Sequence, residues 1–358
     1  MNISLGEQMK KPLLSLMVAG ALAAMAAGAS AQTNLAIYGI VDAGIVWDKN
    51  VTSADKTWRL ESGQHSGSRL GFRGTEDLGG GLTASFTLEN GFNVDTGTLG
   101  QGGRIFGRQA WVGLNGGFGS VKLGRQQTPV YNALLAVDPF AINLAGNAQR
   151  LFGGGLYFSD PFLRTDNTIS YATPNIAGFT GTLGYGFGEV AGDRSLQRQL
   201  VAGASYVNGP VNVQLAYHDA NTATLPAASP FLGTGIADLK TAFLGGTFDF
   251  GIAKAHLAFA KTDVDQAGGT LNQHSWLVGA SAKAGSGTVL ASFIRNDVRD
   301  IAAGQSDQVA LGYIQPLSKR TNIYTSLSYT DNDPAVRVNA FANGERGRLF
   351  NVGVRHQF

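Results

Sequence analysis

The chain contains no cysteine among its 358 residues. Disulfide bonds and thiol nucleophiles are therefore excluded, and cohesion must come from backbone pairing and packing. Charged residues are also scarce, at 15%, and the formal net charge is only +2. This charge is too small to indicate a nucleic acid or an anionic membrane surface as a partner, so any electrostatic function must be local.

Signatures of catalysis are missing as well. There is no Gly-x-Ser-x-Gly elbow, and the five histidines (65, 218, 256, 274 and 356) show no metal-ligand spacing such as His-x-x-x-His. The glycine-rich run at 184–188 lacks the spacing and the following helix of a nucleotide loop, so close strand packing explains it better. We therefore expect neither an enzyme nor a metal or other cofactor.

Long apolar runs are absent except near the N-terminus. Two lysines at positions 10 and 11 precede an apolar run over residues 13–27, and the small residues 29–31 follow. This pattern predicts a signal peptide over residues 1–31, although a start at Met9 and a retained membrane helix remain open. No later segment approaches about 20 uninterrupted apolar residues, so the sequence predicts no spanning helix.

The chain is rich in segments in which apolar and polar residues alternate with a period of two. In the last strand one face carries Phe350, Val352, Val354, His356 and Phe358, and the other carries Asn351, Gly353, Arg355 and Gln357. Successive side chains of a strand point to opposite faces, so this segment has one apolar and one polar face. The same pattern recurs through residues 32–358 without a linker, which predicts a single β domain.

Short glycine-rich or Asn/Pro breaks alternate with long polar stretches and separate about sixteen strands. An even strand number, short periplasmic turns and long external loops are typical of outer-membrane barrels. We predict an all-β fold, a 16-stranded antiparallel transmembrane β-barrel, too wide for side chains to fill. A soluble β-sandwich remains the alternative. The stretch 288–297, apolar on both faces, fits the pattern poorly.

Several segments resemble the Gram-negative general diffusion porins: YGIVDAG at 38–44, SRLGFRGTEDLGGG at 68–81, GRQAWVGL at 107–114, LGRQ at 123–126 and the terminal Phe358. The resemblance covers essentially all of residues 34–358. It implies a homotrimer in the cell outer membrane, in contact with lipid and lipopolysaccharide. It also implies that the third external loop folds into the barrel, and that Phe358 is read by periplasmic chaperones and the barrel-assembly machinery.

Arginines are expected to line the pore. If Leu70 and Phe72 face outward, Arg69 and Arg73 point inward, and Arg108 lies three residues before Trp111 and hence on the opposite face. The resemblance implies that Arg69, Arg108 and Arg164 form a basic ladder opposite the constriction loop. Solvated lumen residues without this role remain the alternative. Glu89 shares its parity with Thr83, Ser85 and Thr87, and we expect it to face the lumen as a partner of a ladder arginine or in a structural ion pair.

The long segment 128–163 corresponds in the resemblance to the inward-folded loop. Such loops usually carry several carboxylates, but here we expect only Asp138, with Asp160 near the return of the loop, and an added Arg150. Fewer opposing acids leave the arginine charge less neutralised, which predicts a modest preference for anions.

Arg125 shares its parity with the outward-facing Val121 and Leu123. A charge facing lipid at mid-depth is costly, so we expect burial at a subunit contact, with Asp95 of a neighbouring subunit as the candidate partner that the resemblance implies. An arginine that extends to the membrane rim is the alternative.

The predicted function is a water-filled channel for passive diffusion of small hydrophilic solutes and ions. Two alternatives remain at this point. One is a substrate-specific channel, and the other is a structural or adhesin barrel with a plugged lumen.

Overall fold

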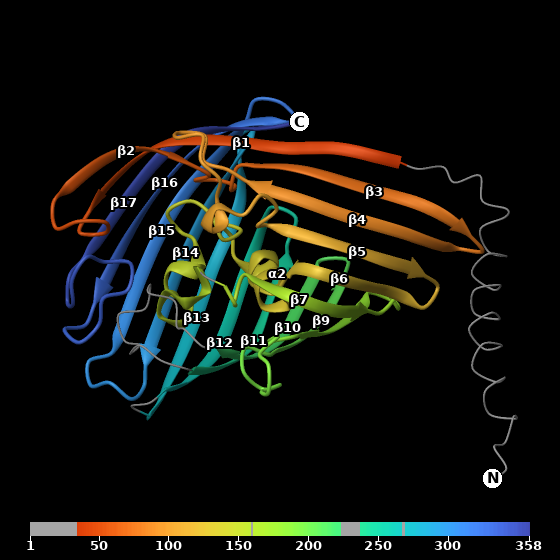
Figure 1. Cartoon of the computed structure of the whole chain (residues 1–358). Coiled ribbons are helices and arrows are strands. Elements are labelled where there is room, and N and C mark those ends of the chain that lie inside the picture. The colour runs from red at the N-terminus through yellow and green to blue at the C-terminus, as the bar shows by residue number, and fades with distance from the viewer. Residues whose placement is uncertain (1–33, 159, 223–236, 267–268) are drawn as a thin grey trace, which may run out of the picture.

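The computed structural model describes residues 34–158, 160–222, 237–266 and 269–358, and the predicted signal peptide lies outside them. They form an antiparallel β-barrel that encloses a short α-helix (Figure 1). The strands are β1 (Asn34–Lys49), β2 (Lys56–Ser62), β3 (Arg69–Gly79), β4 (Leu82–Gly91), β5 (Gln109–Gly116), β6 (Gly119–Gln127), β7 (Arg164–Ala172), β8 (Phe179–Gly186), β9 (Gln199–Asn208), β10 (Val211–Thr222), β11 (Ala237–Asp249), β12 (Ala253–Gln266), β13 (Gly269–Ala284), β14 (Gly287–Val298), β15 (Gln305–Pro316), β16 (Thr321–Asn332) and β17 (Gly347–Gln357). The helical segments are the α-helix α2 (Pro129–Val137) and the 3₁₀ segments η1 (Gln101–Gly103), η2 (Ala148–Arg150) and η3 (Phe152–Phe158).

The sheet closes because its first and last strands pair. β1 and β17 are antiparallel partners from Ile40↔Gln357 to Lys49↔Arg348. β2 pairs with one half of β1 and β3 with the other half, so these two segments share one position in the wall. The 17 strands of the described sheet therefore fill sixteen positions. The predicted 16-stranded antiparallel barrel is confirmed.

Between β2 and β3 the chain leaves the sheet over residues 63–68, and a buried carboxylate fixes this break. Asp42 accepts the backbone N–H groups of His65 (3.0 Å) and Ser66 (2.7 Å) on one oxygen and the Tyr324 hydroxyl (2.7 Å) on the other. Sequence alternation did not predict the break, because it depends on this contact between distant strands.

The apolar face of the strands points outward. Leu215, Leu257 and Leu327 are 50%, 58% and 50% exposed, whereas the alternate residues Ser326 and Ser328 are buried inside the barrel. A sandwich would bury the apolar face instead. None of the described helices has the length and hydropathy needed to cross a membrane.

The hydrophobic core of the protein lies inside the barrel. Residues 128–163, called loop 3 below, fold into the lumen and pack against the inner face of β10–β14 (Figure 1). Leu290 and Ile294 of β14 face inward and are buried, while Phe293 faces outward. The two apolar faces of residues 288–297 are thus explained, because one forms part of the outer surface of the barrel and the other faces the folded loop.

Candidate functional site

Loop 3 enters the lumen as a capped helix. The Thr128 hydroxyl accepts the N–H of Tyr131 (3.0 Å), and Pro129 occupies the first helical position, where its missing N–H costs nothing. The Thr128 N–H also donates to the carbonyl of Leu163 (3.1 Å), which joins the two ends of the loop. The buried face of α2, with Val130, Ala133, Leu134 and Val137, then packs on the wall.

Asp138 organises the interior of loop 3. Its carboxylate accepts three backbone N–H groups, from Phe140 (3.0 Å), Ile142 (2.9 Å) and Ala148 (3.1 Å), and the residue is 4% exposed. Ala141, Ile142 and Leu144 have positive φ values of 49°, 53° and 58°, an uncommon conformation for residues other than glycine. The structure therefore directs Asp138 into the loop and away from the lumen, which differs from its expected place among the acids facing a solute.

Loop 3 contacts both sides of the lumen. On the side of the apolar core, His256 Nδ1 donates to the carbonyl of Val137 (2.6 Å). On the opposite side, the Leu144 N–H donates to the carbonyl of Gln64 (2.6 Å), and the Ala145 N–H donates to Ser326 Oγ (2.9 Å). The loop thus spans the barrel interior and narrows it.

Three arginines gather on the wall beside this narrowing. Arg69 opens β3, Arg108 immediately precedes β5, and Arg164 opens β7. Arg69 Nε donates to the carbonyl of Gly67 (2.9 Å), and Arg164 Nε donates to the carbonyl of Arg108 (2.9 Å). A Cβ added at Gly67 would lie 3.0 Å from Arg108 Nη1, so the Arg108 side chain reaches back toward Arg69. We call Arg69, Arg108 and Arg164 the arginine ladder.

One carboxylate accompanies the arginine ladder. Glu89 Oε1 accepts from Arg108 Nε (2.8 Å), and Oε2 accepts the Tyr38 hydroxyl (2.9 Å). Arg164 lies over the ring of Tyr131 from loop 3, 6.0 Å from the centroid. The cluster therefore holds three cations and one acid, and the face of loop 3 toward Arg164 presents an aromatic ring.

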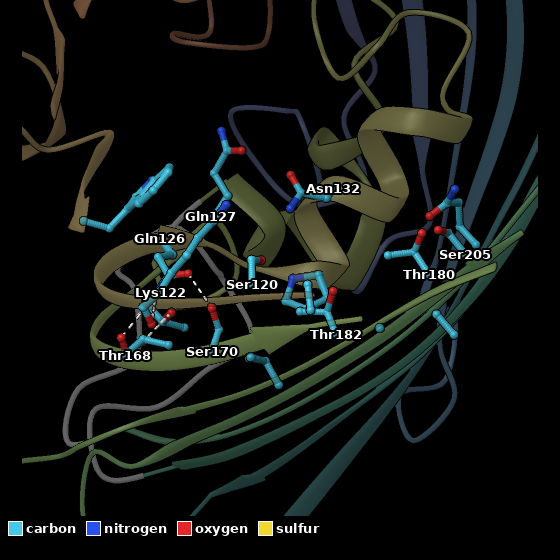
Figure 2. A pocket seen from close by; sticks show the side chains of 18 of the residues that line it. Ser120, Lys122, Gln126, Gln127, Asn132, Thr168, Ser170, Thr180, Thr182 and Ser205 are labelled. Atoms are coloured by element: carbon cyan, nitrogen blue, oxygen red, sulfur yellow. Dashed lines mark hydrogen bonds between the residues drawn. The ribbon is translucent and has the colours of Figure 1, made fainter. Parts of the chain in front are cut away.

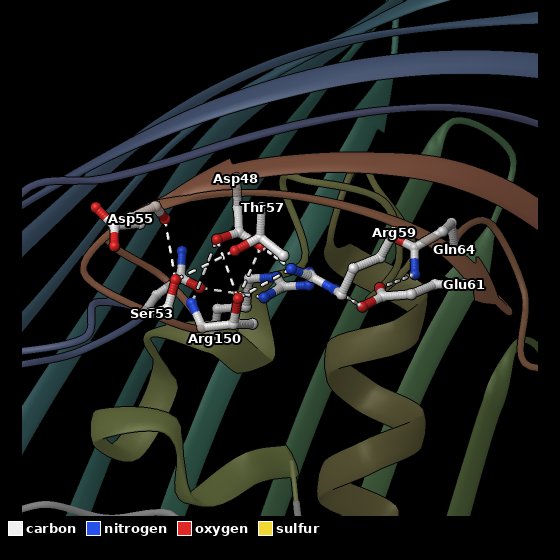
Figure 3. Close-up of polar contacts among 10 residues, drawn as sticks. Asp48, Ser53, Asp55, Thr57, Arg59, Glu61, Gln64 and Arg150 are labelled. Carbon is white, nitrogen blue, oxygen red and sulfur yellow. Dashed lines mark hydrogen bonds and ion pairs between the residues drawn. The ribbon is translucent and has the colours of Figure 1, made fainter.

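The other two expected arginines lie outside this cluster. Arg73 is exposed, four residues further along β3, with its guanidinium 5.1 Å from the Tyr38 ring centroid. Arg150 donates from Nη1 to Asn339 Oδ1 (3.1 Å) and lies beside the ion pair between Arg59 and Asp48 (Figure 3). Arg150 thus joins loop 3 to the segment around β1–β2 and to the loop after β16.

Arg125 finds its acids within the same chain. Nη1 and Nη2 donate to Asp166 Oδ1 (2.6 Å) and Asp160 Oδ2 (2.5 Å), and Nε donates to the carbonyl of Gly107 (2.7 Å). A bulge between Gly124 and Gln126 displaces the register here and lets Arg125 reach these partners. Asp160 therefore pairs with Arg125, and Asp95 lies in an exposed turn. Arg125 thus has two acids of its own chain as partners, and its expected contact with Asp95 of a neighbouring subunit stays a prediction.

This arrangement predicts that Arg125→Gln lowers barrel stability in detergent by about 1–3 kcal/mol, because charged hydrogen bonds to two carboxylates are lost. Heat-modifiability on gels would report a lower unfolding temperature, with the oligomeric state at room temperature unchanged. Asp95→Asn is the matched control and should change neither property. Dissociation of an oligomer by either variant, without a change in barrel unfolding, would contradict this role of Arg125.

Trp111 differs from its expected position. Val112 is 56% exposed and faces outward, so the adjacent Trp111 faces the lumen. The strand begins only at Gln109, and the alternation assumed between Arg108 and Trp111 does not extend across that start. A tryptophan in a strand reads as lipid-facing from sequence, and no local signal indicated otherwise.

Within the described part of the chain, no group of three or more His, Asp or Glu residues could hold a metal ion.

Comparisons with known proteins agree with the barrel. The model of the Gram-negative porin family matches residues 18–335. An outer membrane porin protein of Bordetella pertussis is 33% identical, and outer membrane porin protein 32 of Delftia acidovorans is 34% identical; each alignment covers 98% of this chain and 100% of the relative.

A solved structure described as the anion-selective porin from Comamonas acidovorans superposes with a TM-score of 0.80 at 31% identity, over 91% of this chain and 100% of that one. The closed barrel, the inward-folded loop and full-length similarity to outer membrane porins lead to one assignment. The chain belongs to the Gram-negative porin family and is a protein of the outer membrane.

Proposed function

We propose that the barrel is a water-filled channel for passive diffusion of small hydrophilic solutes and ions, with a modest preference for anions. The observation that carries the proposal is the composition of the narrowing: the arginine ladder faces it with Glu89 as its paired acid, while Asp138 of loop 3 is turned away from the lumen. Arginine keeps its charge and offers several donors to a passing anion.

Two further considerations support this reading. The solved relative from Comamonas acidovorans is described as anion-selective and shares the barrel at 31% identity. The preference remains modest because a charge pair at contact in a water-filled lumen contributes only about 1 kcal/mol, and salt screens it further. We expect selectivity of several-fold to tens-fold.

The assembly and partners are part of the same proposal. The family resemblance favours a homotrimer embedded in outer-membrane lipid and lipopolysaccharide, delivered after removal of residues 1–31. Phe358 closes the seam: its N–H and carbonyl exchange hydrogen bonds of 3.1 Å with Gly39. A Cβ at Gly39 would lie 2.3 Å from the Phe358 ring, so glycine is required for this approach. We propose that the exposed Phe358 ring is the signal for the assembly machinery.

Recording in a planar bilayer tests the proposal. We expect conductance that grows with salt concentration, and a zero-current potential in a KCl gradient that reports a several-fold preference for chloride. A plugged structural or adhesin barrel would conduct nothing appreciable. A chloride current that saturates at low salt would instead favour a substrate-specific channel, and a preference for potassium would contradict the role of the arginine ladder.

A further inference from the structure

A separate hollow lies in the lumen on the short-turn side of the arginine ladder. It has a volume of about 300 Å³ and is bounded by the inner faces of β5–β10 and by the first turn of α2 (Figure 2). Ser120 and Ala172, which line it, adjoin the short turns after β5 and β7. This volume is in the range of known pockets for small molecules. None of the three ladder arginines lines it.

Lys122 supplies a fixed positive charge to this hollow. Leu123 is 52% exposed on the outer wall, so Lys122 points into the lumen. Its Nζ lies 4.2 Å from the ring centroid of Trp111, a cation–π contact that holds the side chain in place. Within the described residues the ammonium has no ion pair or hydrogen bond with the protein, so its donors are available to a solute.

The rest of the lining is rich in amides and hydroxyls. Gln126 is held by a hydrogen bond from Ser170 Oγ (2.7 Å) and by its own donation to the carbonyl of Thr168 (3.1 Å). Other polar side chains around the hollow make no hydrogen bond within the described part of the chain: Gln127, Asn132, Thr180, Thr182 and Ser205 (Figure 2). They offer several donors and acceptors at the edge of one cavity.

We propose that this hollow is a binding subsite for a sugar acid, a polyhydroxylated solute with one carboxylate. Lys122 would pair with the carboxylate, and the amides and hydroxyls would take the hydroxyl groups. A neutral sugar would leave the ammonium without its counter-charge, and a simple anion would leave the polar lining unused. One ammonium matches a monoanion better than a dianion. The proposal rests on the channel function, because the solute reaches the hollow through the pore.

Binding can be measured without conduction. D-galacturonate is added to the detergent-solubilised protein while tryptophan fluorescence is recorded, with galactose and acetate as comparison solutes. We expect a saturable signal with galacturonate at lower concentration than with either comparison solute. Trp111→Phe should abolish the signal, because the other three of the four tryptophans do not line the hollow.

Variants then separate the subsite from general electrostatics. Lys122→Gln should raise the galacturonate concentration needed for half-maximal binding about fivefold, the effect of losing one contact ion pair in a wet lumen. Lys254→Gln is the matched control. It removes a lysine on the parity of the inward-facing His256, outside the hollow, and should leave binding unchanged.

The same proteins are finally compared in planar bilayers. We expect galacturonate to reduce the chloride current of the native channel in a saturable manner, and Lys122→Gln to weaken this block. Equal binding of galacturonate, galactose and acetate, or equal binding by native protein and Lys122→Gln, would overturn the subsite and leave the channel function intact. Normal binding in detergent with no current in bilayers would overturn the channel function and leave the subsite standing.

Discussion

Replacing Arg108 by glutamate should move ion selectivity about tenfold toward cations, the largest functional effect expected from one substitution. The change removes the central cation of the arginine ladder and places a second carboxylate beside Glu89, which now accepts from Arg108 Nε at 2.8 Å. Two units of charge are altered at the narrowing. Each contributes about 1 kcal/mol before salt screens it, and a screened sum of about 1.4 kcal/mol corresponds to a factor of ten. The zero-current potential in a KCl gradient measures the shift.

Two further variants make this test specific. Arg73→Glu makes the same charge change at an arginine outside the cluster and should have a much smaller effect. Glu89→Gln removes the paired acid and should shift the potential in the opposite direction, toward anions. If Arg108→Glu folds, conducts and leaves the potential unchanged, Arg108 does not face the permeating ions.

Asp138→Ala should release loop 3 and produce a larger and more variable single-channel conductance. The substitution leaves three buried N–H groups, those of Phe140, Ile142 and Ala148, without their acceptor. Each such group costs about 1–3 kcal/mol, so the folded loop would lose several kcal/mol. Limited proteolysis should cut within loop 3 of the variant while the barrel remains intact. A native conductance and a protected loop would show that apolar packing alone holds the loop.

The pH dependence of the loop follows from the same carboxyl. Burial raises the pKa of Asp138 to about 6, against the three N–H donors that lower it. The ordinary carboxyl pKa in an unfolded chain is about 4. The folded loop thus binds this proton more tightly than the unfolded chain does. The resulting stabilisation of the folded loop is fully present below about pH 4 and is lost as the pH rises through about 6. Protection of loop 3 should be stronger at pH 4 than at pH 7, and Asp138→Asn, which keeps an oxygen acceptor, should remove the difference.

The sequence predicted the barrel well because strand alternation is a local property. The final strand, from Gly347 to Gln357, places Asn351 inside and Val352 and Val354 outside, as its pattern indicates. Loop 3 was found by its length and by family resemblance. The stretch 288–297 was ambiguous because its inner apolar face is explained only by the loop that folds against it.

The side-chain contacts within the site could not be predicted from strand alternation or from the family resemblance. Which acid pairs with Arg125 depends on a bulge, and the direction of Asp138 depends on backbone N–H groups up to ten residues away. Asp42 fixes the break between β2 and β3, and its hydrogen-bond partner Tyr324 lies 282 positions away in the sequence. None of these contacts leaves a periodic mark in the sequence, so only the folded chain reveals them.

Loop 3 packs on β10–β14 and reaches across the lumen to Gln64 and Ser326, and the arginine ladder lies together on the β3–β7 flank of the narrowing. Permeating solutes therefore pass between this apolar loop and a cationic flank of the wall. A dipolar molecule in transit experiences a sideways field, and an amino acid would travel with its carboxylate turned toward the β3–β7 flank. Passage through this barrel is therefore oriented across the pore axis, and the solute's own polarity decides which of its ends faces the arginine ladder.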